Sequence, residues 1–88
     1  MTTNERQSAH TAARAAITLD KSGDAAGRDR AMADLWAAVG YWRTHRISTT
    51  AEYRGESIPP KMIRFPNGRA QPWRTHRNRA ARAWAAIA

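Results

Sequence analysis

The sequence predicts a mainly α-helical protein, a small three-helix domain with a short β-hairpin before the last helix. Three stretches place apolar residues three and four positions apart, the spacing of amphipathic helices. Pro66-Asn67-Gly68 gives a strong turn signal ahead of the third stretch. The chain has 88 residues, which is the size of one domain. We therefore expect residues 1–88 to fold as a single domain.

The first helix is expected over residues 3–19. Thr2 and Glu5 have the spacing of a capping box, and good helix formers follow them. Gly23 is then expected to form a turn and Asp24 to cap the next helix. The inner stripe of the first helix consists of small or aliphatic residues that permit close approach of another helix, namely Ala9, Ala12, Ala13, Ala16, Ile17 and Leu19.

The second helix is expected over residues 25–46, paired with the first as an antiparallel hairpin. Gly40 inside a helix costs about 1 kcal/mol relative to alanine. The glycine therefore predicts a close contact or a slight bend at that position. The apolar face of this helix consists of Met32, Leu35, Trp36, Val39 and Trp42.

Residues 47–71 are expected to form an irregular segment that contains the β-hairpin. Residues 62–65 and 69–71 are strand candidates on either side of the turn. An isolated two-stranded ribbon is marginal in water, so the hairpin must pack on the helices.

The last helix is expected over residues 72–88. Pro72 suits the first helical position, because its φ angle is already fixed near the helical value. One stripe of this helix carries the residues that we expect to be buried, which are Trp73, Ala80, Trp84 and Ile87.

The expected core is thin, because nineteen residues are alanine and large apolar side chains are few. Four tryptophans must then supply much of the buried area. A thin core is often completed by a partner, so self-association into a homo-oligomer is one expectation. The chain has no cysteine, which excludes disulfides and cysteine-ligated metals. No signal peptide or membrane span is recognised, which predicts a cytoplasmic protein without membrane contact.

Charge divides the chain into a neutral half and a strongly basic half. Residues 1–40 carry five basic and five acidic side chains, whereas residues 41–88 carry ten basic and two acidic ones, for a net charge of +8. Beyond Glu56 no side chain is acidic. Within the single domain, a neutral helical hairpin (1–46) is thus separate from a basic C-terminal helix (72–88). Such asymmetry indicates an anionic partner, most often nucleic acid, with DNA favoured over RNA.

The string WRTHR occurs twice, at residues 42–46 and 73–77. The flanking residues differ, which argues against a tandem repeat. Two explanations of the repeated string remain, namely compositional bias and a shared function of the two copies. The first copy is expected in the last turn of the second helix, where Arg43, His45 and Arg46 suit the negative end of the helix dipole without any ligand. The second copy is expected at the start of the last helix, where arginines oppose the dipole and an anion would be stabilised.

Eight residues of the basic half are candidate phosphate ligands. Arginine predominates among them, which favours bidentate contacts with phosphate. Phe65 and Trp73 lie between these cations and offer either base stacking or core packing. The candidate nucleic-acid-binding residues are Lys61, Arg64, Arg69, Arg74, His76, Arg77, Arg79 and Arg82.

No catalytic arrangement is recognised in the sequence. The chain contains no nucleophile motif and no glycine-rich phosphate loop. His10, His45 and His76 fall on three separate expected helices, so a metal site is not predicted. We therefore expect neither enzymatic activity nor a cofactor.

The segment from Thr50 onward, TAEYRG followed by IPPKMIRFPNGRA and RTHRNRAARAW, resembles in outline the small winged-helix excisionase-type proteins. Those proteins have a short helix, a turn, a hairpin wing and an arginine-rich stretch before a closing helix with a tryptophan. In this chain Pro66 would shorten the second helix that this family has. The acidic residue that usually caps its closing helix is missing, and the resemblance does not extend to residues 1–46. The outline therefore identifies no family.

Two functions remain open. The first is a small basic nucleic-acid-binding accessory protein that grips the phosphate backbone through its arginine-rich C-terminal half with little sequence readout. The second is a non-enzymatic protein-binding adaptor or inhibitor whose basic face meets an acidic protein surface. The two differ in their response to salt and in competition by polyanions.

Overall fold

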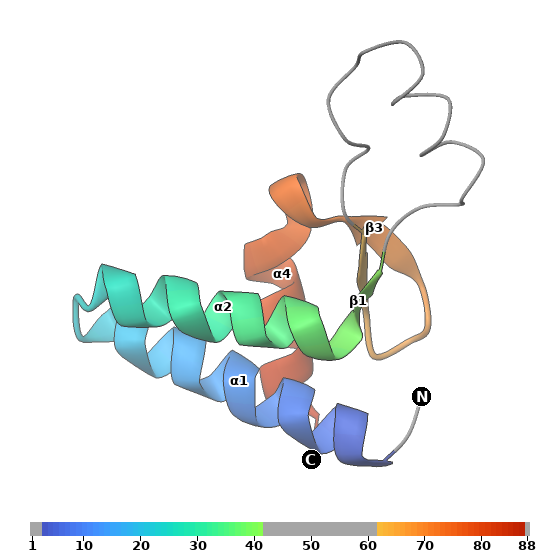
Figure 1. Cartoon of the computed structure of the whole chain (residues 1–88), viewed down its shortest axis with the longest axis horizontal. Coiled ribbons are helices and arrows are strands. Elements are labelled where there is room, and N and C mark those ends of the chain that lie inside the picture. The colour runs from blue at the N-terminus through green and yellow to red at the C-terminus, as the bar shows by residue number, and fades with distance from the viewer. Residues whose placement is uncertain (1–2, 42–61, 88) are drawn as a thin grey trace, which may run out of the picture.

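The computed structural model describes residues 3–41 and 62–87 and is mainly helical (Figure 1). The described helices are α1 (Thr3–Lys21), α2 (Ala25–Val39) and α4 (Trp73–Ala86). The described strands, which form one antiparallel sheet in the order of their numbers, are β1 (Gly40–Tyr41), β2 (Met62–Arg64) and β3 (Ala70–Pro72). The β2–β3 hairpin immediately precedes α4, which confirms the predicted fold class.

Helices α1 and α2 form an antiparallel pair joined by a tight turn, and α4 crosses behind them in Figure 1. Gly23 in the turn has a φ of 83°, a conformation that glycine adopts without steric cost. The Asp24 carboxylate accepts a hydrogen bond of 2.9 Å from the backbone N–H of Gly27 and so caps α2. The predicted turn and N-cap are therefore confirmed. Helix α4 packs more extensively on α1 than on α2.

Helix α2 ends earlier than the sequence predicts. It stops at Val39, and the chain continues as β1, where Gly40 pairs with Ile63 of β2. The prediction of an unbroken helix from residue 25 through residue 46 is therefore wrong. The reason is a strand pairing with a distant segment, which the apolar spacing within residues 25–46 does not reveal. The first WRTHR copy itself lies outside the described residues.

Gly40 is required by space rather than by backbone angle. Its φ of −77° suits any residue, but a Cβ atom at this position would overlap the indole of Trp36. The predicted close contact is therefore confirmed.

We expect Gly40→Ala to lower the free energy of unfolding by about 1–3 kcal/mol, the usual range for overpacking. A thermal melt measures this loss. The same substitution should cost less in a chain that also carries Trp36→Leu, because the smaller side chain leaves room for the new methyl group. Equal melting of Gly40→Ala and the parent chain would contradict the close packing of Trp36 on this glycine.

The β2–β3 hairpin has the loop that the Pro66-Asn67-Gly68 signal predicts. The Phe65 N–H donates to the Arg69 carbonyl at 2.7 Å, and the Gly68 N–H donates to the Phe65 carbonyl at 2.9 Å. Gly68 has a φ of 88°. These features match a three-residue hairpin loop with glycine in the left-handed position.

The core is as thin as the composition predicts. Seven of the twelve buried residues in the described part of the chain are alanines. The largest fully buried side chains are Trp84, Leu35 and Ile63. Trp36 and Trp73 are partly buried and pack against this core.

Two tryptophans hold the sheet against the helices. Trp36 Nε1 of α2 donates a hydrogen bond of 3.2 Å to the Met62 carbonyl. Trp84 Nε1 of α4 donates one of 2.7 Å to the Arg64 carbonyl. Strand β2 thus receives an indole N–H from each of two helices, which ties the sheet to both α2 and α4. The hairpin packs on the helices, as its short length requires.

Candidate nucleic-acid interface

Helix α4 presents its four arginines to solvent. Within the described residues, no carboxylate pairs with any of them, since the ion pairs seen there join Arg28 to two aspartates. Helix α4 also has no acidic residue in its first turn, and no side chain caps its N-terminus. The exposed arginines of α4 are Arg74, Arg77, Arg79 and Arg82.

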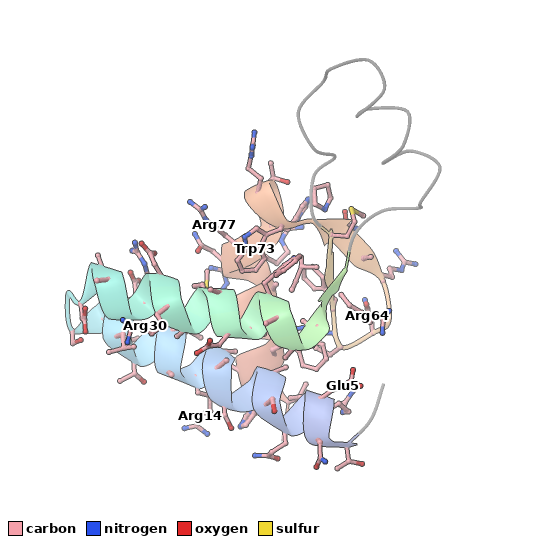
Figure 2. The ribbon with its side chains drawn as sticks, in the orientation of Figure 1. Glu5, Arg14, Arg30, Arg64, Trp73 and Arg77 are labelled. Atoms are coloured by element: carbon pink, nitrogen blue, oxygen red, sulfur yellow. The ribbon has the colours of Figure 1, made fainter. Side chains whose placement is uncertain are left out.

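These arginines do not share one face of α4. Arg77 stands four residues after Trp73 and seven before Trp84, so it lies on the face that both tryptophans occupy. Figure 2 shows Trp73 and Arg77 next to each other, above the ribbon of α2. Arg79 stands five residues before Trp84 and therefore lies on the opposite side of the helix. The helix presents cations both toward α2 and away from it.

The candidates outside this set of arginines have different surroundings. Arg69 is exposed beside the hairpin loop, whereas Arg64 is half-buried and stands opposite Ala70. His76 is half-buried, and its Nδ1 atom is enclosed with no hydrogen-bond partner among the described residues. This nitrogen is not offered to a ligand at the surface. Lys61 lies outside the described residues.

Between α2 and α4 lies a groove that sequence reasoning did not find. Two adjoining cavities of about 400 Å³ and about 430 Å³ share Arg28, Met32 and Asn78 as lining residues, and we call the two together the α2–α4 groove. The first cavity ends at Trp36, Trp73 and Arg77. The second extends to α1 and is lined by residues that include Ile17, Lys21 and Arg82.

The spacing of the α2 residues held a signal for this groove. Arg28, Met32 and Trp36 are four residues apart, which places them along one side of the helix. Because Arg28 belongs to the electrically neutral half of the chain, it was not expected in the binding site. Its position beside Arg77 follows from the packing of α4 and not from the sequence of α2.

Electrostatically, the groove combines one compensated cation with uncompensated ones. Arg28 Nη1 lies 2.9 Å from Asp20 Oδ1, and Nη2 lies 3.0 Å from Asp29 Oδ1. The hydrogen bond to Asp20, and after it the one to Asp29, raises the pKa of Arg28 above its usual value. Arg77 and Arg82 have no such partner among the described residues. The uncompensated positive charge that the groove offers to an anionic ligand therefore lies mainly on α4.

The described residues contain no group of three or more acidic or histidine side chains that could hold a metal ion. Among the helices described, none has the length and apolar character needed to cross a membrane.

Comparison with known proteins adds no family to these observations. No protein-family model, no curated protein and no solved structure matches this chain.

Proposed function

We propose that this chain is a small, non-enzymatic nucleic-acid-binding accessory protein of the cytoplasm, which grips the phosphate backbone through α4 and the adjoining hairpin loop. The observation that carries the proposal is the set of exposed arginines on a segment of the chain, residues 62–87, that has no acidic side chain. Residues 62–87 contain six arginines and no aspartate or glutamate. A surface of this kind attracts polyanions over long distances and binds phosphate without reading sequence.

Arginine suits this role better than lysine would. Its planar guanidinium group donates two parallel hydrogen bonds to one phosphate. Of the arginines with exposed side chains, Arg69, Arg74, Arg79 and Arg82 form the proposed phosphate surface. Arg77 lines a cavity together with residues of α2 and is not part of this surface.

The test is a titration of a DNA duplex at several salt concentrations. About four phosphate contacts would give a slope of about −3.6 in a plot of log K against log salt, because each contact releases condensed counterions. Unrelated duplex sequences should bind with similar affinity. Binding that does not change with salt would contradict a phosphate grip.

The adaptor function is the other outcome of this experiment. If neither duplex nor single-stranded DNA binds at low salt, then the basic surface meets an acidic protein instead. Direct binding of nucleic acid, with the salt dependence that phosphate contacts produce, therefore separates the two functions.

A further inference from the structure

The α2–α4 groove offers two indole side chains at one end. Trp36 comes from α2 and Trp73 from the first turn of α4, and both line the same cavity of about 400 Å³. Both are partly buried. They therefore keep aromatic surface that the core does not use.

Trp36 is held in place before any ligand arrives. Its Nε1 atom donates to the Met62 carbonyl at 3.2 Å, and its ring lies so close to Gly40 that a Cβ atom there would overlap it. A fixed aromatic ring loses little conformational freedom when a ligand packs on it.

The same cavity carries the polar groups that a nucleotide requires. Arg77 is exposed and lies one helical turn beyond Trp73, so a phosphate can be bound next to a ring that contacts the tryptophans. Asn78 lines the cavity as well, and its side-chain amide both donates and accepts hydrogen bonds. Asp29 at the rim is already bonded to Arg28, which reduces its repulsion of an anion.

We propose that the α2–α4 groove binds single-stranded nucleic acid, with an unpaired base against Trp36 and Trp73 and a neighbouring phosphate on Arg77. The proposal rests on the proposed function and specifies its preferred ligand. Bases of a duplex are stacked on one another and cannot offer their faces to aromatic side chains, whereas unpaired bases can. An acidic peptide would also meet the arginine, but its aspartate and glutamate side chains offer no aromatic ring to stack on the two indoles.

The test compares a short oligo(dT) strand with an abasic strand of the same length, which has the same phosphates without bases. We expect the parent chain to bind oligo(dT) about 5- to 150-fold more tightly, the range for stacking one base on an aromatic side chain. Trp73→Leu keeps an apolar side chain and should remove most of this preference. A circular dichroism melt of the variant confirms that it is folded.

Arg77→Gln and Arg79→Gln form a matched pair for the same measurement. Both remove one exposed positive charge from α4, but only Arg77 lines the groove. We expect Arg77→Gln to weaken oligo(dT) binding severalfold more than Arg79→Gln does, whereas duplex binding should weaken more for Arg79→Gln, because Arg79 belongs to the phosphate surface and Arg77 does not. This pair keeps the test decisive if Trp73→Leu fails to fold.

Several results would overturn the inference. Equal affinity for oligo(dT) and the abasic strand, or equal loss from the two arginine variants, would show that bases do not enter the groove. Tight binding of poly-glutamate that depends on Arg77, without any preference for bases, would assign the groove to an acidic peptide. If duplex DNA binds in these cases, the proposed function stands without this inference, and if no nucleic acid binds, both fail.

Discussion

Replacing Trp84 with alanine is expected to lower the free energy of unfolding by about 3–5 kcal/mol, the largest effect of any single substitution in the described core. Its side chain has no exposed surface. The neighbouring core is built mostly from alanines, which cannot reach across the cavity that the indole would leave. A domain of this size has a total stability at or below the usual 5–15 kcal/mol. A circular dichroism melt should therefore show a largely unfolded chain.

The reason lies in the contacts that the Trp84 side chain makes with two elements, β2 and α1. Its Nε1 atom donates to the Arg64 carbonyl of β2 at 2.7 Å. The guanidinium carbon of Arg6 lies 5.8 Å from the centroid of its ring, within the range of a cation–π contact.

A second variant separates packing from hydrogen bonding. Trp84→Phe keeps an aromatic ring but leaves the Arg64 carbonyl without its donor, so we expect a smaller loss, about 1–3 kcal/mol. A melt of Trp84→Ala that matches the parent chain would contradict the burial of α4 against β2 and α1.

Local sequence signals predicted the features whose causes are local. Asp24 caps α2 because its carboxylate reaches the N–H of Gly27 three residues ahead, and Gly68 closes the hairpin because the loop requires a left-handed residue. The end of α2 has no such local cause. Gly40 pairs with Ile63 instead of continuing the helix, so the end of α2 depends on a strand, β2, that comes later in the chain.

The candidate site shows the same division. The excess of arginine in α4 was evident from composition, and the four-residue step from Trp73 to Arg77 places both on one face. Which helix that face meets depends on the packing of α4 across α1 and α2. Arg28 and Trp36 therefore entered the site only with the structure. The burial of His76 Nδ1 was likewise not evident from its place among arginines.

The second large effect concerns the phosphate surface. Changing Arg74 and Arg79 together to glutamine should reduce the salt slope of duplex binding by about two units, one for each lost phosphate contact. Neither residue lines the α2–α4 groove or takes part in an ion pair among the described residues, so the melting temperature should stay nearly constant. Loss of Arg74 in the first turn of α4 even removes an unfavourable interaction with the helix dipole.

The matched control changes Arg14 and Arg30 to glutamine. This double variant has the same net charge, but its substitutions lie on α1 and α2, away from Arg77 and the start of α4 (Figure 2). Both residues are exposed. Only long-range attraction, which salt screens, should weaken in this variant.

The slope of log K against log salt for these two double variants, measured on one DNA duplex, tests the central claim most directly. If α4 grips the phosphate backbone, the slope changes from about −3.6 to about −1.8 for Arg74→Gln with Arg79→Gln and stays near −3.6 for Arg14→Gln with Arg30→Gln. Equal slopes for the two variants would show that only the overall positive charge binds DNA, and would contradict an interface on α4.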